Sequence, residues 1–263
     1  MSVLEDDSTS DTPRLLIDQP GPQNLVVVDW AVLSVQGRQR LRNEDAWAQG
    51  GPVFAVADGM GGLANGNQAS AVAVNAVLRY WTVRDVPSAE KVVRAANAEV
   101  RAAAGGASGE VPASGTTLSA LRIGNDKALA VHVGDSRVYR VRRSQAELLT
   151  RDHNLRSELL ATGIVPKSVQ SLGPLRALTS YLGMPDQDLQ IDVRSVGLRP
   201  GDRILLCTDG VFGEISHRQL AELAGVGDAA LAAQSLIAVA GADDATAMVV
   251  DIGRGDAPRS SRG

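Results

Sequence analysis

Strand-like and helix-like segments of this chain come in blocks and do not alternate. Two apolar runs rich in β-branched residues are followed by two helical patterns, and these segments lie at 26–35, 53–57, 67–80 and 88–104. Three further strand patterns then come in a row, at 117–123, 128–133 and 137–141. Regular alternation would favour a parallel sheet, whereas blocks favour antiparallel sheets with helices packed outside them. We therefore predict an α+β fold.

The last part of the chain continues this mixture and shows neither an internal repeat nor a linker. Its expected elements are a short helix, two strands, two helices and a final strand, at 154–162, 189–196, 203–207, 216–223, 228–239 and 245–251. Polar composition without any period marks residues 1–24 as a disordered leader and residues 253–263 as a flexible tail. One folded domain is therefore predicted over 25–252.

Charge and cysteine content exclude several classes of protein. The net charge of −4 argues against a nucleic-acid binder, which usually presents a basic face. Cys207 is the only cysteine, so the chain has no internal disulfide, no CxxC redox pair and no cysteine-based zinc site. A cysteine-nucleophile phosphatase would need an arginine six residues after its cysteine, and this chain has Gly213 there.

Hydropathy gives no reason to place the chain in a membrane. No segment approaches the ~18 apolar residues that a membrane helix needs. The N-terminus is acidic and lacks the apolar core of a secretory signal. We therefore expect a cytoplasmic protein.

Four aspartates each adjoin an apolar strand-like run. Asp58, Asp135 and Asp209 each follow such a run, and Asp243 lies just before one. A lone Asp-Gly at a strand end is usually an ordinary turn, and the glycines that follow the first and third of these aspartates are expected to permit one. Four such ends are harder to explain in this way. If the carboxylates converge, their like charges require cations or raised pKa values, and oxygen-only ligands indicate Mg²⁺ or Mn²⁺.

An arginine-rich segment lies ahead of these strand ends. Arg38, Arg40 and Arg42 fall within five residues, next to Glu44 and Asp45. One interpretation is a solvated, salt-bridged loop. The other is a guanidinium fork that holds a phosphate group beside a metal-binding carboxylate.

A series of short motifs runs through residues 33–251. They are Gly37-x-x-Arg40-x-x-Asn43-Glu44-Asp45, Val56-Ala57-Asp58-Gly59-Met60-Gly61-Gly62, Ser114-Gly115-Thr116-Thr117, Val133-Gly134-Asp135-Ser136-Arg137, Asp152-His153-Asn154-Leu155, Leu178-Thr179-x-x-Leu182-Gly183, Arg199-Pro200-Gly201-Asp202, Thr208-Asp209-Gly210 and Asp243-Asp244-Ala245-Thr246. In this order the chain resembles the metal-dependent protein phosphatases of the PPM, or type 2C, family in their compact bacterial form. The resemblance implies a four-layer sandwich of two antiparallel β-sheets flanked by α-helices.

The resemblance also implies a metal-ligand set. By this likeness Asp58 bridges two metal ions and the Gly59 carbonyl binds one of them, while Asp209 and Asp243 complete the other site. Asp135 matches a position that helps to bind a third, looser ion. The implied cofactors are two or three Mn²⁺ or Mg²⁺ ions per chain, and 163–178 corresponds to a flap beside the site.

The catalytic roles come from the same likeness. Arg40 is the implied substrate-binding residue, holding the phosphate, and Glu44 and Asp45 act through metal-bound waters next to Asp58. The implied activity is hydrolysis of phosphoserine and phosphothreonine in proteins by direct attack of a metal-bridging water. The implied partners are phosphorylated proteins and a cognate bacterial Ser/Thr kinase, with no nucleic acid, no membrane and a monomeric chain.

Two departures from the family pattern keep alternatives open. Met60 stands where some members carry a histidine thought to protonate the leaving oxygen. Asp244 replaces a more usual asparagine, and Asp-Asp-x-Thr is typical of related stress and sporulation phosphatases that act on a phosphorylated anti-sigma antagonist. An inactive phosphoprotein-binding module on the same fold is the remaining alternative, although it predicts the loss of metal ligands that this chain retains.

Overall fold

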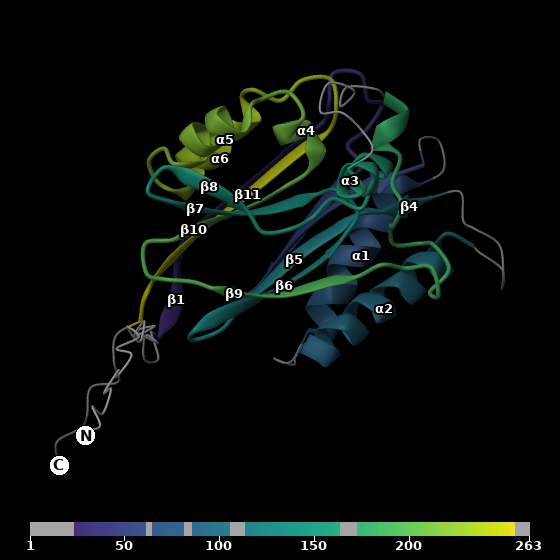
Figure 1. The fold of residues 1–263 in the computed structure, drawn as a ribbon, viewed down its shortest axis with the longest axis horizontal. Helices are drawn as coiled ribbons and strands as arrows, with labels where there is room; N and C mark the ends of the chain where they lie inside the picture. The colour runs from purple at the N-terminus through teal and green to yellow at the C-terminus, as the bar shows by residue number, and fades with distance from the viewer. Residues whose placement is uncertain (1–23, 62–64, 82–85, 106–113, 164–172, 256–263) are drawn as a thin grey trace, which may run out of the picture.

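The computed structural model describes residues 24–61, 65–81, 86–105, 114–163 and 173–255. Within these ranges two antiparallel sheets face each other (Figure 1). The first has the strand order β1-β11-β10-β7-β8, and the second has the order β2-β3-β5-β6-β9 with β4 paired to β3.

The bounds of the strands follow from the pairing. In the first sheet they are β1 Leu25–Val35, β7 Arg137–Arg142, β8 Gln145–Leu148, β10 Arg203–Cys207 and β11 Ala245–Arg254. In the second they are β2 Asp45–Gly50, β3 Val53–Met60, β4 Gly115–Thr116, β5 Leu118–Ile123, β6 Lys127–Val133 and β9 Asp192–Gly197.

Helices cover the outer faces of both sheets. Helices α1 (Gly66–Tyr80) and α2 (Val86–Ala103) pack on the second sheet, and α5 (His217–Ala224) and α6 (Ala229–Ile237) pack on the first (Figure 1). Two short helices, α3 (Leu155–Ala161) and α4 (Asp209–Phe212), and the 3₁₀ turn Gly173–Arg176 lie in the connections. The predicted four-layer sandwich is therefore confirmed.

Three apolar clusters hold these layers together. One lies between the two sheets and includes Phe54, Leu121 and Leu206, all nearly inaccessible to water. The other two lie between each sheet and its own pair of helices, and small residues such as Ala73 and Ala232 dominate there. Small side chains let the helices approach the sheets closely, so a chain with few aromatic residues still fills its interior at ordinary density.

Most predicted elements are present with shifted ends. Three strands were missed, β2, β4 and β8, because none of them has a clear apolar run in its sequence. Strand β9 begins at Asp192, three residues after its predicted start, and β11 continues to Arg254, two residues into the predicted tail. That extension pairs Gly253 with Val26 and Arg254 with Leu25. The predicted leader and most of the predicted flap lie outside the described residues.

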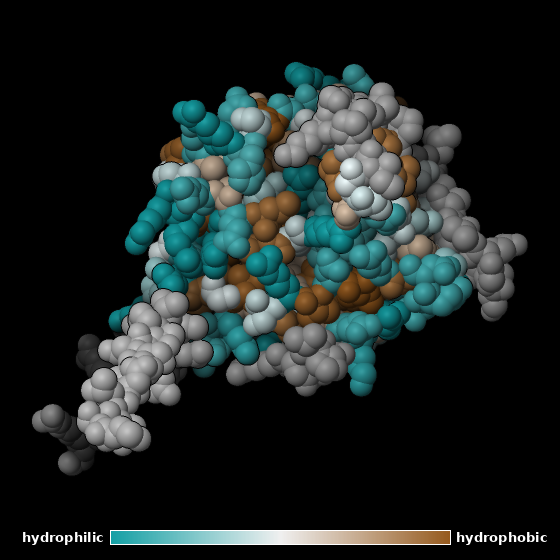
Figure 2. Space-filling view, in the orientation of Figure 1, coloured by the Kyte–Doolittle hydropathy of each residue, from teal (hydrophilic) through white to brown (hydrophobic). Residues whose placement is uncertain are grey.

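No helix in the described part of the chain combines the length and the apolar character needed to cross a membrane. Hydrophilic side chains occupy much of the face shown in Figure 2.

Candidate metal and phosphate site

Two aspartates from neighbouring strands stand directly opposite each other. In the antiparallel ladder of β2 and β3, Asp45 is paired with Asp58. Directly opposed like charges destabilise a sheet. The pair therefore needs either a proton or a cation between the two carboxylates.

Hydroxyl groups of the other sheet hold Asp45. Its Oδ2 atom accepts hydrogen bonds from Thr208 Oγ1 at 2.8 Å and Thr246 Oγ1 at 2.7 Å. Thr208 follows β10 and Thr246 lies in β11, so one carboxylate ties the two sheets together at this end. Its other oxygen, Oδ1, is buried and has no hydrogen-bond partner among the described residues. Such an orphaned oxygen is costly unless something else binds it.

Backbone and hydroxyl contacts fix Asp58 in the same way. Its N–H donates to Thr117 Oγ1 at 2.9 Å. Its carbonyl accepts from Thr116 Oγ1 and from the Thr117 N–H, both at 2.9 Å. The main chain at Asp58 is therefore immobilised, and its carboxylate is directed at the neighbouring acids.

The electrostatics show that these carboxylates are crowded. Loss of hydration raises the pKa of Asp45 to about 7, and it raises the pKa of Asp58 well above its ordinary value. The pKa of Asp209 is raised by the same burial and by the charge of Asp243. Each of these groups is an acid that its surroundings push towards the neutral form. A divalent cation would reverse that preference.

Asp209 and Asp243 come from the first sheet. Asp209 is the first residue of α4, directly after Thr208 at the N-cap. Asp243 lies two residues before β11, and its Oδ1 accepts from the Asp244 N–H at 2.8 Å and from Arg40 Nε at 2.6 Å. The Arg40 guanidinium therefore supplies the positive charge next to Asp243 in this structure.

Asp244 anchors the arginine-rich loop. Its Oδ1 accepts from the Gly37 N–H at 2.8 Å, and its Oδ2 accepts from the Glu44 N–H at 2.9 Å. The two bonds close the ends of the segment that carries Arg40. The aspartate uses both of its oxygens as acceptors, whereas an asparagine could offer only one acceptor oxygen here. This contact gives the departure from the family pattern a structural role.

The glycines next to Asp58 and Asp209 act differently from the prediction. Neither one adopts the left-handed conformation of a tight turn. A Cβ on Gly59 would stand 2.3 Å from the Gly66 carbonyl oxygen, and a Cβ on Gly210 would stand 2.0 Å from the Asp244 oxygen. Both glycines are required because the backbone of another segment of the chain approaches closely. The predicted tight turn was wrong at both positions.

Glu44 lies behind the site. It is buried, and its Oε1 makes no hydrogen bond among the described residues, although Arg42 Nε lies 3.6 Å away. Its backbone carbonyl accepts from the Ser70 hydroxyl at 2.6 Å and from the Gly59 N–H at 3.1 Å. Glu44 thus contributes a second unsatisfied carboxylate oxygen beside the strand that carries Asp58.

Asp135 lies in the turn after β6, at the same end. The preceding Gly134 has φ +98°. Two hydrogen bonds join this glycine to His153. The His153 N–H donates to the Gly134 carbonyl at 2.7 Å, and the Gly134 N–H donates to His153 Nδ1 at 3.3 Å. Burial, followed by the charges of Asp209 and Asp152, raises the pKa of Asp135 to about 7. Arg137, two residues further on, makes a bidentate ion pair with Asp152.

Two adjoining hollows give access to these acids. One of about 420 Å³ is lined by Arg40, Asp209 and Asp243, and one of about 200 Å³ is lined by Asp135 and Asp209. Arg176 lines both, and Glu214 lines the larger one. No motif in the sequence marked either of these two residues, because each is an isolated charge in a stretch without a period. Asp209 lies where the two hollows meet.

The chemistry of the residues present suits divalent cations. Within the described ranges, however, no three acidic, histidine or cysteine side chains lie close enough together to hold one as they stand. The donor set is all oxygen, as Mg²⁺ and Mn²⁺ prefer. Two buried carboxylate oxygens, Asp45 Oδ1 and Glu44 Oε1, lack hydrogen-bond partners within the described residues. The Arg40 guanidinium contacts Asp243 Oδ1, and both residues line the larger hollow.

Comparison with known proteins decides the family. Residues 36–235 match the family model described as protein phosphatase 2C. The chain belongs to the protein phosphatase 2C family. The resemblance drawn from the motifs is thereby confirmed.

Curated relatives are named as protein phosphatases. The chain is 31% identical over 242 residues to the serine/threonine protein phosphatase PstP of Mycobacterium tuberculosis, a match that covers 86% of this chain. It is 29% identical over 206 residues to the protein phosphatase PhpP of Streptococcus pneumoniae, covering 73% of this chain and 82% of PhpP. The chain spans only 45% of the length of PstP.

Solved structures agree with the sandwich. The PPM Ser-Thr phosphatase MsPP from Mycobacterium smegmatis, solved in complex with cacodylate, superimposes with a TM-score of 0.76 at 32% identity, covering 86% of this chain and 98% of that one. The catalytic domain of PstP in complex with two manganese ions gives a TM-score of 0.75 at 28% identity, covering 87% and 99%.

Proposed function

We propose that this chain is a metal-dependent protein phosphatase that hydrolyses phosphoserine and phosphothreonine in proteins. The observation that carries the proposal is the set of aspartates from both sheets whose pKa values are raised by shared burial and by one another. Such a group is neutralised either by bound protons or by a cation, and a divalent cation would allow all of these carboxylates to be charged at neutral pH. The family membership and the named phosphatases among the relatives support the same activity.

Mn²⁺ or Mg²⁺ would be held by the side chains of Asp58, Asp209 and Asp243 and by the Gly59 carbonyl, with Asp135 beside a further ion. When bound, these cations would screen the phosphate charge and lower the pKa of a coordinated water. Two ions are the expected minimum, as the manganese complex of the PstP catalytic domain supports. Glu44 and Asp45 would accept hydrogen bonds from water through Glu44 Oε1 and Asp45 Oδ1, which accept none from the described residues.

Arg40 is the proposed phosphate ligand. Its side chain lines the larger hollow, and its Nε and Nη2 already contact the carboxylate of Asp243. A guanidinium is a planar fork that matches either a carboxylate or a phosphate group. A substrate phosphate would compete with Asp243 for it, and a cation on Asp243 would favour the phosphate.

Water is the proposed nucleophile, because neither Cys207 nor His132 is placed to attack a phosphate. Cys207 is completely buried in β10, and burial raises the pKa of its thiol. His132 is buried too, and burial lowers its pKa to about 4 while its Nδ1 meets the Ser119 hydroxyl. Neither group faces the hollows.

The proposed partners are phosphorylated proteins and a Ser/Thr kinase that the phosphatase opposes, and the proposed setting is the cytoplasm with a monomeric chain. The serine/threonine phosphatase names of the relatives favour this function over the anti-sigma alternative. The inactive-module alternative predicts missing ligands, and Asp58, Asp209 and Asp243 are all present.

The test is a comparison of phosphopeptides. Purified protein with Mn²⁺ is expected to release phosphate from a phosphothreonine or phosphoserine peptide and to act far more slowly on the phosphotyrosine version of the same sequence. Equal rates on both kinds of peptide would overturn the Ser/Thr assignment. Absence of release from all of them would favour the inactive module.

A further inference from the structure

A third hollow lies at the other end of β7 from the carboxylate site. It measures about 430 Å³, as large as the hollow that contains Arg40, and it is lined by Arg140, Arg142, Arg143, Gln145, Ala146 and Glu147. We call it the arginine hollow. Hydrophilic side chains gather over β7 and β8 in Figure 2.

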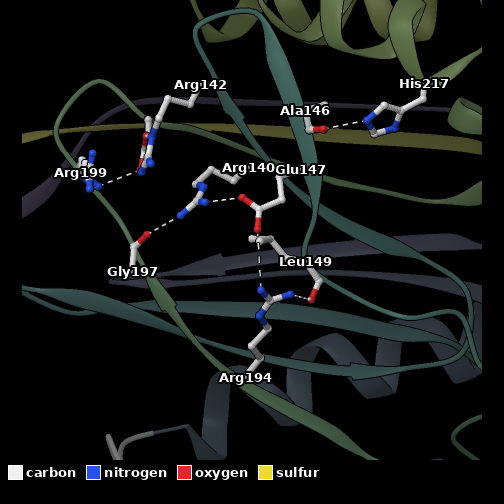
Figure 3. Close-up of polar contacts among 10 residues, drawn as sticks. Arg140, Arg142, Ala146, Glu147, Leu149, Arg194, Gly197, Arg199 and His217 are labelled. Carbon is white, nitrogen blue, oxygen red and sulfur yellow. Dashed lines mark hydrogen bonds and ion pairs between the residues drawn. The ribbon is translucent and has the colours of Figure 1, made fainter. Parts of the chain in front are cut away.

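The arginine hollow is lined by residues of β7, β8 and the turn between them, and it lies beside the edge of the second sheet. β8 is the last strand of the first sheet, and β9 is the last strand of the second. Arg140 crosses between them: its Nη1 donates to the Gly197 carbonyl in β9 at 2.7 Å, and its Nη2 meets Glu147 in β8. Figure 3 shows Arg194 of β9 approaching the same Glu147 from below. The side chains of Arg140 and Arg194 therefore bridge the two edges beside the hollow.

Positive charge is in excess around the arginine hollow. Arg142 makes a bidentate ion pair with Asp202, which is buried. The Asp202 carboxylate also accepts a hydrogen bond from the Arg199 N–H. Glu147 is the only acid of the lining. Within the described residues, Arg143 and Arg199 have no carboxylate within ion-pair distance. In a chain with a net charge of −4, this local excess requires an explanation.

Arg194 also has donors to spare. Its side chain is 53% exposed, and its Nη1 donates to the Leu149 carbonyl at 3.1 Å. Its Nη2 lies 3.7 Å from Glu147, which is beyond hydrogen-bond range. A guanidinium has five N–H donors, so most of those on Arg194 remain available to an acidic ligand.

The turn that presents Arg143 is strained. Arg142 pairs with Gln145, and the two residues between them, Arg143 and Ser144, have φ values of +51° and +58°. Two-residue hairpin turns of this kind usually carry Asn-Gly or Asp-Gly, because other residues adopt the left-handed conformation at a cost. Strain of this sort is often retained at binding sites. The turn displays the Arg143 side chain at the rim of the hollow.

We propose that the arginine hollow binds an acidic stretch of the phosphoprotein substrate, away from the phosphate that is hydrolysed. This docking surface rests on the proposed phosphatase function. The charge of the hollow selects carboxylate side chains, and the half-exposed Arg194 beside it offers further donors to them. Docking of this kind raises affinity without entering the chemistry, so it acts on KM and leaves kcat unchanged.

The geometry sets the spacing between the two groups of the substrate. Arg137 lines a hollow at the carboxylate site, and Arg142 lines the arginine hollow. Five residue steps along β7 separate them, which corresponds to about 17 Å. An extended peptide covers that distance in roughly five to seven residues. The acidic stretch is therefore expected at about this separation from the phosphothreonine and not next to it.

The experiment compares phosphothreonine peptides that differ only in a flanking block. One carries four aspartates beginning six residues from the phosphothreonine, one carries four asparagines there, and one carries the aspartates two residues away. The six-residue aspartate peptide is expected to show a KM about 3- to 10-fold lower than the asparagine peptide at low ionic strength, with the same kcat. Separate sets place the block on either side of the phosphothreonine.

Two variants and a matched control locate the effect. Arg143→Asn removes the charge while keeping a residue that tolerates the left-handed turn, and Arg194→Gln removes a half-exposed charge. The pair is expected to abolish the preference for aspartate and to leave kcat on the asparagine peptide unchanged. Arg218→Gln removes an arginine of α5 that is 88% exposed and pairs only with Glu222 among the described residues, so it is expected to keep the preference.

The outcomes separate this proposal from the proposed function. Equal KM values for the aspartate and asparagine peptides in the wild-type protein would overturn the docking surface, as would an equal loss of preference in Arg218→Gln. Binding of the aspartate peptide without its phosphate, measured by fluorescence anisotropy in chelator, gives a result even if no peptide is hydrolysed. Binding that depends on Arg143 and Arg194 would then support the surface while the phosphatase function fails.

Discussion

Asp45 and Asp58 are cross-strand neighbours, the first at the start of β2 and the second near the end of β3. Hydroxyls of the opposite sheet hold Asp45, and Thr116 and Thr117 hold the main chain of Asp58. The two carboxylates can therefore not relax away from each other. Their repulsion is built into the fold, and the predictions below depend on how it is relieved.

The stability of the metal-free protein is expected to change with pH through the ionisation of Asp135. Its folded-state pKa is raised from 3.8 to about 7, so the folded protein binds this proton more tightly than the unfolded chain does. The contribution is fully present below pH ~4 and is lost as the pH rises through about 7, by on the order of a few kcal/mol. Asp135→Asn has no carboxyl group at this position to ionise, so its stability should not fall in this way as the pH rises. In chelator at pH 8, denaturant unfolding should show the variant to be more stable than wild type.

Two further observations accompany this prediction. The two proteins should converge near pH 4, where the wild-type carboxyl is protonated. Added Mn²⁺ should stabilise the wild type more than Asp135→Asn at pH 8, because only the wild type has the additional anionic ligand. A wild type that is the more stable protein in chelator at pH 8 would contradict the account of this residue.

Asp244→Asn is expected to loosen the loop that carries Arg40. The variant keeps one acceptor oxygen and turns an amide N–H₂ towards either the Gly37 or the Glu44 N–H, so one charge-assisted hydrogen bond is lost. Thermal or denaturant unfolding should show a loss of about 1–3 kcal/mol. Asp228→Asn is the control, since asparagine caps α6 as well as aspartate does. Equal stability of Asp244→Asn and wild type would show that one bond suffices.

Gly59→Ala is expected to damage both the fold and the site. The added methyl would lie 2.3 Å from the Gly66 oxygen and 2.5 Å from the Glu44 oxygen, which are backbone atoms and cannot rotate away. The free energy of unfolding should fall by about 1–3 kcal/mol, and phosphatase activity should fall with it. Gly197→Ala is the matched control, because nothing lies within 4 Å of its added Cβ. Similar stabilities for the two variants would refute the close approach.

Arg40→Ala is expected to raise KM for phosphopeptides more than it lowers kcat. A group that binds the phosphate equally in the ground state and the transition state contributes uniform binding, and its loss appears in KM. Arg40→Lys should restore only part of the affinity, since lysine lacks the bidentate fork. Steady-state kinetics on one phosphothreonine peptide measure both constants. A change confined to kcat would assign Arg40 to the transition state.

The sequence predicted the residues of the site more completely than it predicted the edge strands of the two sheets. Apolar runs ending in Asp58 and Asp209 could be read directly, because buried central strands have a strong pattern. β2 and β8 were missed, since an edge strand such as Gln145–Leu148 needs little apolar character. The threonines that hold Asp45 come from residues more than 160 positions away. Contacts of that range follow from sheet packing, which no local pattern contains.

The arginine-rich loop shows the same limit. The sequence placed Arg40 beside carboxylates, but it did not show that Asp244 would hold both ends of the loop or that Asp243 would pair with the guanidinium. The tight-turn interpretation of Gly59 and Gly210 was wrong for a related reason. A glycine in a sequence signals either a turn or a close approach, and only the packed structure distinguishes the two.

The most direct test of the central claim is a manganese titration of metal-depleted protein, with phosphate release from a phosphothreonine peptide as the readout. Wild type is expected to be inactive in chelator and to regain full activity as Mn²⁺ is restored. Asp209→Ala should stay folded by its thermal unfolding transition and should stay inactive at every Mn²⁺ concentration. Full turnover by the wild type in excess chelator, or unchanged kcat in Asp209→Ala, would contradict a site in which these carboxylates hold the catalytic metal ions.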